Sequence, residues 1–301
     1  IRDSTNATRR DGPAATRVAP VRPPRDYTPA MASATPRSGA AATREDAGAA
    51  ATWVCVPTYN EAETVETLVH RVLEVFARHR IDGRVLVIDD ASPDGTGRIA
   101  DGLAAADDRV RVLHRAGKQG IGPAYRDGFR QALDEGAERI VEMDCDLSHD
   151  PEALPSLLTA TLHADLVIGS RYVPGGRIED WGLVRRMISR FGCWYAQAIL
   201  AIPVRDLTGG FKCFRREVLD ALPLDEVGAA GYGFQVEMTY RAWLDGFRVV
   251  EVPITFRERD HGRSKMSQRI VVEAAVLVPR LRRRLGHRRA RARTGSAGAA
   301  R

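Results

Sequence analysis

The chain has 301 residues, enough for one large or two small domains, and its net charge of +6 at first suggests a nucleic-acid partner. The positive charge lies at the two ends, however. Residues 1–50 hold eight Arg against five acidic residues and residues 280–301 hold nine Arg and no acid, so residues 51–279 have a net charge of −6. This acidic middle argues against a nucleic-acid-binding core, which would need basic residues on its own folded surface.

The cysteines and the apolar runs indicate the compartment. The four cysteines show neither CxxC spacing nor a His at the spacing of a zinc site, so we expect reduced thiols in a cytosolic protein. No signal-peptide pattern opens the sequence, and the longest apolar runs are well short of the roughly 20 residues that a helix needs to cross a bilayer. We expect a protein that is soluble or peripheral to a membrane.

The composition divides the chain into four parts. Residues 1–50 are rich in Ala, Pro, Arg, Thr and Ser without apolar periodicity, which predicts a disordered N-terminal extension. Residues 51–266 carry the regular patterns of one folded domain. An apolar run followed by arginines predicts an amphipathic C-terminal helix over 267–285, and a disordered basic tail follows over 286–301.

Within residues 51–266, short apolar strands alternate with helical patterns. We predict strands at residues 53–57, 84–89, 110–114, 139–143 and 165–170, and helices at 61–79, from the second strand to about 106, at 122–135 and at about 152–163. Such alternation predicts an α/β fold with a mostly parallel central sheet and helices on both faces. Ligands of open sheets of this kind bind outside the carboxyl ends of the strands.

The stretch VEMDCDLSHD at residues 141–150 carries the most informative pattern. Asp144 and Asp146 are two residues apart at the end of the apolar-led segment RIVEM. Alternate residues of a strand share one face, so both carboxylates can point at one object. Mg²⁺ and Mn²⁺ prefer such oxygen ligands and keep a bound diphosphate as a further ligand. The pair alone would also fit a solvated turn, but polar motifs follow the neighbouring strands too.

Two of these motifs suit a nucleoside. Tyr59, in PTYNE after the first strand, can stack on a base, and Glu61 can accept hydrogen bonds from a ribose or a base edge, although a proline turn before a helix explains the motif equally well. Asp90 closes the second strand, where a carboxylate suits a nucleoside hydroxyl group or base. Asp94 follows in ordinary turn chemistry and is interpreted as a helix cap. The glycines of KQGIG, residues 118–122, give only a weak anion-binding signal.

A basic segment follows the fifth predicted strand. Arg185 and Ser189 are four residues apart and share one face of a helix, so together they can hold one phosphate group. Arg171, in GSRY, directly follows the strand itself. A solvated basic helix face is the alternative for these residues.

Taken together, these segments resemble the polyprenol-phosphate mannosyltransferases, often called dolichol-phosphate mannose synthases, within glycosyltransferase family 2. The resemblance covers roughly residues 52–270. It rests on PTYNE, VIDDASPDGT, KQGIGPAYRDGF, MDCDLSHDP, GSRYVPGG, RRMISR, DLTGGFKCFRR, GYGFQVEM and FRERDHGRSKM, which occur in this order. It implies a nucleotide-diphospho-sugar transferase fold of the GT-A type.

The resemblance also implies a set of site residues. Nucleotide-sugar binding is implied for Pro57, Tyr59, Glu61, Ile88, Asp90, Met143, Asp144, Cys145, Gln235, Arg259 and Lys265. Gln235 and Glu237 are implied to lie close to the sugar or to line the site. Metal binding is implied for Asp144 and Asp146, catalysis for Asp144, Asp146, Arg259 and Lys265, and binding of the acceptor phosphate for Arg171, Arg185 and Ser189. In two departures from the family pattern, Cys145 replaces the usual Ala, and Ser148 stands where some relatives have a third metal ligand.

The implied reaction is transfer of mannose from GDP-mannose to a polyprenyl monophosphate, with Mg²⁺ or Mn²⁺ and inversion at the anomeric carbon. UDP-glucose or another donor with the same acceptor is the alternative, because pocket shape decides the choice of base and sugar. An RNA-binding protein that uses the Arg-rich tail is the rival from another class. It is disfavoured by the acidic core and the lack of an aromatic, basic face.

The lipid acceptor implies peripheral contact with the cytoplasmic face of a membrane, direct or through a separate membrane protein. The apolar run Ile270–Val278 would span about 14 Å as a helix, less than half of a ~30 Å bilayer core. With the arginines after it, the run suits an interfacial anchor on anionic lipid. A helix packed on the core, followed by a disordered tail, is the alternative.

Overall fold

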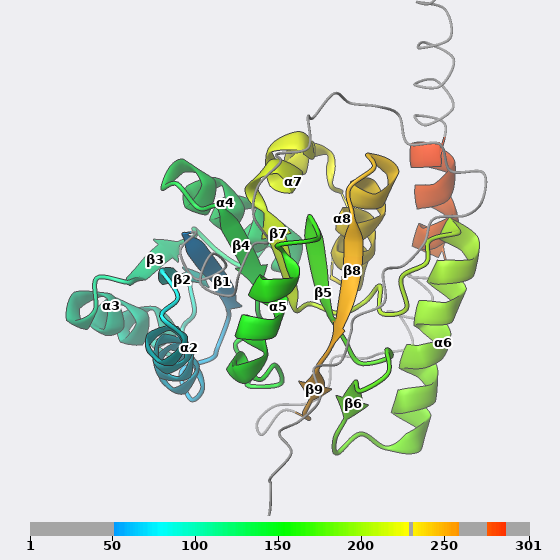
Figure 1. The fold of residues 1–301 in the computed structure, drawn as a ribbon. Helices are drawn as coiled ribbons and strands as arrows, with labels where there is room; N and C mark the ends of the chain where they lie inside the picture. The colour runs from blue at the N-terminus through cyan, green and yellow to red at the C-terminus, as the bar shows by residue number, and fades with distance from the viewer. Residues whose placement is uncertain (1–50, 229–230, 259–275, 287–301) are drawn as a thin grey trace, which may run out of the picture.

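The computed structural model describes residues 51–228, 231–258 and 276–286. Their centre is a seven-stranded sheet in the order β3-β2-β1-β4-β7-β5-β8 (Figure 1). All neighbouring strands are parallel except at β7, which is antiparallel to β4 and to β5. The strands are β1 (Thr52–Thr58), β2 (Gly83–Asp89), β3 (Val110–His114), β4 (Arg139–Glu142), β5 (Leu166–Ser170), β7 (Lys212–Arg215) and β8 (Val249–Pro253).

Helices cover both faces of the sheet because the strands are apolar on both sides. In β1, Val54 and Val56 belong to one buried cluster, and Trp53 and Cys55 belong to the other. The first cluster is covered by α2 (Val65–His79), α3 (Thr96–Ala106) and α5 (Leu154–Ala160). The second is covered by α4 (Ile121–Asp134), α6 (Leu183–Leu200), α7 (Arg216–Ala221) and α8 (Tyr232–Leu244). The predicted α/β fold with a mostly parallel sheet is confirmed.

The strands and helices predicted between residues 53 and 170 all occur, with small changes at their ends. The helix expected at about 152–163 is divided into a 3₁₀ turn, η1 (Pro151–Ala153), and the short α5. A second 3₁₀ turn, η2 (Leu224–Glu226), follows α7. Two short strands, β6 (Arg177–Ile178) and β9 (Thr255–Phe256), pair in parallel beside the lower end of α6 (Figure 1).

The strand order places a topological switch point at β1. The chain runs outward from β1 to β2 and β3, then returns to pair β4 with the other side of β1. The connections that leave β1 and β4 therefore diverge at the carboxyl edge, which is where open α/β sheets bind ligands. The motif that contains Tyr59 follows β1, and the two aspartates Asp144 and Asp146 follow β4.

The C-terminal helix, described over residues 276–286, packs on the core instead of offering its apolar face to a membrane. Val278, Leu281 and Leu285 are buried in the cluster that also contains α4, α6 and α8 residues. For residues 276–286 this burial favours the packed-helix alternative, whereas most of the apolar run expected to form the anchor, residues 270–275, lies outside the described residues. Predictions for residues 1–50, 259–275 and 287–301 lie outside the described residues. Among the described helices, none combines the length and apolar character required to span a membrane.

Candidate active site

The two aspartates lie directly after β4, in a tightly held turn. Asp144 is partly exposed and Asp146 is buried, with 7% of its surface exposed. The carboxylate of Asp146 accepts the Ser148 amide at 3.1 Å, and the Asp144 amide donates to Nδ1 of His149 at 3.2 Å. Burial lowers the pKa of His149. A neutral imidazole can accept at Nδ1, so this contact fixes the backbone at Asp144.

The loops at this edge of the sheet store backbone strain. Three non-glycine residues adopt left-handed φ angles in the loops that follow β1, β2 and β4: Asn60 at 60°, Ala91 at 55° and Leu147 at 61°. Asn tolerates this conformation, but for Ala and Leu it costs on the order of 1–2 kcal/mol. Such strain collects at functional sites, where the surrounding contacts hold it.

The donor set fits a hard divalent cation that shares its coordination with a ligand. Asp144 and Asp146 supply two carboxylates. The buried hydroxyl of Ser148 has no hydrogen-bond partner among the described residues. The described part of the chain contains no group of three or more His, Cys, Asp or Glu residues arranged to hold a metal. The protein would therefore provide few ligands and leave positions for diphosphate oxygens and water, as Mg²⁺ sites often do.

The loop after β1 is tied to its neighbours. The amide of Glu61 donates to Oγ1 of Thr96 at 3.0 Å, and Oε2 of Glu61 accepts from Thr64 at 3.1 Å. The ammonium group of Lys118 lies 3.7 Å from the centre of the Tyr59 ring, in a cation–π contact. Lys118 therefore covers one face of the ring that was expected to stack on a base.

Asp90 is held by a cation that the sequence did not single out. Arg115 forms ion pairs with Asp90 and, at 2.8 Å, with Asp127, and its side chain is 6% exposed. The available sequence signal was an Arg directly after the third predicted strand. Asp94 accepts the amides of Thr96 and Ala62, each at 3.0 Å, but the N-cap of α3 is Gly95, so the interpretation of Asp94 as the helix cap is corrected to a contact that joins the loops after β1 and β2.

Three predicted nucleotide-binding residues have side chains directed into the protein. Ile88 and Met143 are fully buried, and Cys145 is 3% exposed with its Sγ 3.7 Å from Oγ1 of Thr64. Any contact with a ligand is therefore restricted to their main chains. Pro57 is partly exposed and lies opposite Ile88 in the β1·β2 register.

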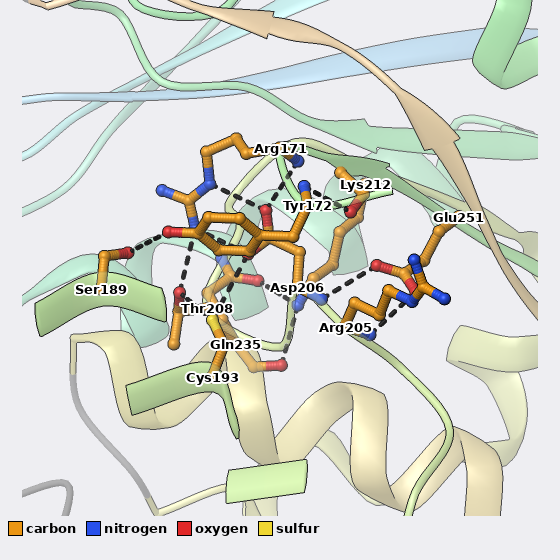
Figure 2. Close-up of polar contacts among 11 residues, drawn as sticks. Arg171, Tyr172, Ser189, Cys193, Arg205, Asp206, Thr208, Lys212, Gln235 and Glu251 are labelled. Atoms are coloured by element: carbon orange, nitrogen blue, oxygen red, sulfur yellow. Dashed lines mark hydrogen bonds and ion pairs between the residues drawn. The ribbon is translucent and has the colours of Figure 1, made fainter. Parts of the chain in front are cut away.

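Near Asp144 lies a buried polar group that sequence reasoning missed. Lys212 of β7 is fully buried and donates to the carbonyl of Gln235 at 2.8 Å and to its Oε1 at 2.7 Å (Figure 2). Its register partner across β4·β7 is Glu142, also fully buried. Burial raises the pKa of Glu142 to about 7 and lowers that of Lys212 to about 8, while each charge opposes the other's shift. The sequence signal for this pair was one charged residue in each of two otherwise apolar segments, Glu142 in β4 and Lys212 in β7.

Gln235 and Glu237 point in different directions, as residues two apart on a helix do. Gln235 faces Lys212. Glu237 pairs with Arg241 at 2.7 Å and with Arg284 of the C-terminal helix. The expectation that Glu237 lies near the sugar is corrected, because its carboxylate ties α8 to residues 276–286.

Arg171 is part of a buried ion pair. It donates to Asp206 from its amide at 2.9 Å, from Nε at 2.8 Å and from Nη2 at 2.6 Å (Figure 2). Burial alone would raise the pKa of Asp206, but the guanidinium charge and these hydrogen bonds hold it below its usual value. This arrangement conflicts with direct phosphate binding by Arg171 and gives the residue a supporting role.

The other two predicted acceptor residues belong to α6. Ser189 accepts a hydrogen bond from the Tyr172 hydroxyl at 2.7 Å. The guanidinium of Arg185 lies 4.0 Å from the Trp181 ring centre and pairs with Glu258. Because Arg171 contacts the rings of both Tyr172 and Trp181, at 5.3 and 5.7 Å, the structure brings all three predicted residues around two aromatic rings. Arg259 and Lys265 lie outside the described residues.

The outer face of α6 is apolar and exposed. Its large exposed side chains are Leu183, Val184, Met187, Ile188, Phe191 and Trp194, with exposed fractions from 41% to 76%. They recur at helical spacing, so they form one stripe along the helix. Contiguous exposed apolar surface of this kind indicates a contact with a membrane or another protein.

Comparison with known proteins agrees with this organisation. Residues 53–222 match glycosyl transferase family 2. An undecaprenyl-phosphate mannosyltransferase of Micrococcus luteus is 50% identical over 225 residues, which cover 75% of this chain and 91% of that protein. The chain belongs to glycosyl transferase family 2. A second member, the polyprenol monophosphomannose synthase of Mycolicibacterium smegmatis, is 48% identical over 229 residues, covering 75% of this chain and 85% of that protein.

A solved structure supports the fold assignment for this glycosyltransferase. Glucosyl-3-phosphoglycerate synthase from Mycobacterium tuberculosis, in complex with Mn²⁺, UDP-glucose and phosphoglyceric acid, matches with a TM-score of 0.58 and 20% identity. The match covers 82% of this chain and 85% of that one. The expected GT-A type fold and the resemblance described above are confirmed.

Proposed function

We propose that this glycosyltransferase transfers mannose from GDP-mannose to a polyprenyl monophosphate, releasing GDP. The observation that carries the proposal is the 50% identity, over 75% of the chain, to an enzyme named undecaprenyl-phosphate mannosyltransferase. The site geometry is compatible with it, since two carboxylates follow β4 beside the loop of Tyr59. Across the sheet, α6 carries Arg185 and Ser189 beside an exposed apolar stripe.

The chain's own residues would divide the work. Tyr59, Glu61 and Asp90 would hold the nucleoside, and Asp144 and Asp146 would hold Mg²⁺ or Mn²⁺ against the diphosphate. When bound, such a cation neutralises charge that grows on the leaving diphosphate. Arg259 and Lys265 are proposed to add positive charge there. A phosphate monoester is already anionic near neutral pH, because its second pKa is about 6, so no residue is assigned as a general base.

A lipid acceptor gives the stripe on α6 a role. We propose that the stripe rests on the membrane surface, with the exposed Arg186 and Arg190 attracting anionic lipid headgroups. The phosphate of a membrane-bound acceptor would then be within reach of Arg185 and Ser189. Inversion at the anomeric carbon follows from direct attack by that phosphate.

A transfer assay tests the proposal. The protein is incubated with labelled GDP-mannose or UDP-glucose, polyprenyl phosphate and Mn²⁺, and the lipid fraction is counted. Mannosyl lipid formed only with GDP-mannose is the expected result. Transfer of glucose alone would overturn the proposed donor, and no lipid product from either donor would overturn the proposed reaction.

A further inference from the structure

Neither the backbone conformation nor the packing of the protein requires glycine at position 210. Its φ angle is outside the left-handed region. A Cβ added there would lie 3.6 Å from both carboxylate oxygens of Asp144 and 3.8 Å from Nε2 of Gln235, which is ordinary van der Waals contact. The residue is partly exposed. The protein alone would accommodate alanine, so the space above Gly210 is available to something else.

Lys212 determines which end of the Gln235 amide faces this space. Because Nζ of Lys212 donates to Oε1 at 2.7 Å and to the backbone carbonyl of the same residue at 2.8 Å, the amide oxygen is fixed toward the lysine. The amide nitrogen is consequently on the side of Gly210. This nitrogen is buried and makes no hydrogen bond of normal geometry among the described residues. It lies near enough to Glu142 to lower the pKa of that carboxyl group. An amide nitrogen has two hydrogens, so at least one can serve a ligand.

We propose that Lys212 is a positioning residue that orients Gln235 so that the space above Gly210 binds a hydroxyl group of the transferred sugar. A sugar hydroxyl both donates and accepts a hydrogen bond. It therefore complements an amide donor on one side and the Asp144 carboxylate on the other. The inference rests on the proposed function, which supplies a sugar nucleotide as the ligand. Within that ligand, these residues would bind the sugar and not the nucleotide.

The reverse orientation of the amide explains why the lysine is needed. With Oε1 turned toward Gly210, two acceptors would face each other across the space, and a hydroxyl group could donate to only one of them. A buried lysine is expensive to desolvate, and the pKa of Lys212 falls to about 8 as a result. That cost is balanced by two hydrogen bonds and the buried charge of Glu142, and it yields one fixed amide orientation.

The first test is Gly210→Ala, measured by calorimetry with GDP and with GDP-mannose in the presence of Mn²⁺. The methyl group would occupy the space for the sugar and leave the nucleotide contacts intact. We expect GDP-mannose to bind about tenfold more weakly, because one or two hydrogen bonds to the sugar are lost. The affinity for GDP should change by less than about twofold. Gly102→Ala in α3, where an added Cβ meets nothing within 4 Å, is the matched control. Equal weakening of both ligands, or of neither, would overturn the inference.

The second test is a double-mutant cycle with Lys212→Met and Gln235→Met, using the same two ligands. If Lys212 acts through Gln235, each single variant lowers the GDP-mannose affinity relative to GDP, and the double variant is no worse than Gln235→Met. Additive effects would contradict the inference. Arg139→Met controls for loss of a buried cation at the opposite end of β4. If Lys212→Met does not fold, Gly210→Ala and Gln235→Met still decide the outcome.

The wild-type measurements separate this inference from the proposed function. Binding of GDP-mannose without mannosyl transfer would overturn the function alone. Transfer with equal loss of both ligands in Gly210→Ala would overturn the sugar site alone. Failure to bind either GDP-mannose or UDP-glucose would overturn both. If UDP-glucose is the donor that binds, the same variants are compared with UDP-glucose and UDP.

Discussion

The proposed donor half of the site, after β1, β2 and β4, and the proposed acceptor half, after β5 and on α6, are built differently. In the donor half, the two aspartates after β4 are held within their own turn, by the Ser148 amide on Asp146 and by the contact between the Asp144 amide and His149. In the acceptor half, the buried Arg171–Asp206 pair joins residues 35 apart in sequence and supports two aromatic rings below α6. Substitutions should therefore damage chemistry in the donor half and stability or acceptor binding in the acceptor half.

Removing the buried cation of the acceptor half should have the largest effect. Arg171→Met would leave the Asp206 carboxylate, which is fully buried, without its counter-charge. Breaking a buried pair in this way costs about 3–5 kcal/mol of unfolding free energy. Urea denaturation followed by circular dichroism measures the loss. A loss below about 1 kcal/mol would mean that the pair does not organise this half.

The double variant Arg171→Met/Asp206→Asn is the control, because it removes the uncompensated charge and should recover part of the loss. The pH dependence gives a second check. The folded pKa of Asp206 lies below its unfolded value, which is about 3.9. Its stabilisation is therefore fully present above that pH and is lost as the pH falls toward the folded pKa. Asp206→Asn should flatten the stability curve in that acidic range.

In the donor half, Asp146→Asn should reduce turnover with little change in stability. Asn keeps an oxygen for the Ser148 amide and removes the charge proposed to hold the cation. We expect about a 100-fold lower kcat, in the range found when one transition-state contact is removed. Asp150→Asn, in the same loop, is the matched control. Full turnover of a folded Asp146→Asn protein, or of the wild type in excess chelator, would refute the assignment.

This contrast also explains what the sequence could predict. The donor half follows from local patterns, since β1, β2 and β4 are apolar runs and Tyr59, Asp90 and Asp144 stand at their ends. The neighbours of these residues were missed: Lys118 over Tyr59 and Arg115 on Asp90 are brought there by other strands and loops. No local pattern identifies a contact made between separate strands.

The acceptor half was less predictable because its main contacts are long-range. Nothing near Arg171 in the sequence indicates that Asp206 will take its charge, so the arginine resembled a phosphate ligand. Glu237 was misplaced for the same reason, since its partner Arg284 is 47 residues away. The four-residue β7 also gave no periodic signal, although it supplies Lys212 to the site.

Arg185→Ala should affect the acceptor more than the donor. The guanidinium lies over the Trp181 ring and pairs with Glu258. Loss of one charge-assisted hydrogen bond predicts about a tenfold higher KM for polyprenyl phosphate and GDP binding within about twofold of wild type. Arg78→Ala, which removes an exposed, ion-paired arginine from α2, is the control. If GDP affinity falls instead, Arg185 belongs to the donor half.

The smallest effect is expected from single substitutions on the outer face of α6. These substitutions test whether α6 or the C-terminal helix contacts the membrane. On the C-terminal helix, residues 276–286, apolar side chains such as Leu281 pack inward, whereas Phe191 of α6 is 62% exposed. Partial burial of one such side chain in a membrane surface contributes on the order of 1 kcal/mol.

Phe191→Ser should therefore lower co-sedimentation with anionic vesicles several-fold and slow transfer to long-chain acceptors. Transfer to a short, water-soluble prenyl phosphate should hardly change, because the proposed phosphate contacts of Arg185 and Ser189 remain. Val276→Ser, at an exposed apolar position of the C-terminal helix, is the matched control and should bind vesicles like the wild type. If Val276→Ser releases the protein and Phe191→Ser does not, the membrane contact lies on the C-terminal helix, and the exposed stripe of α6 must serve a different partner.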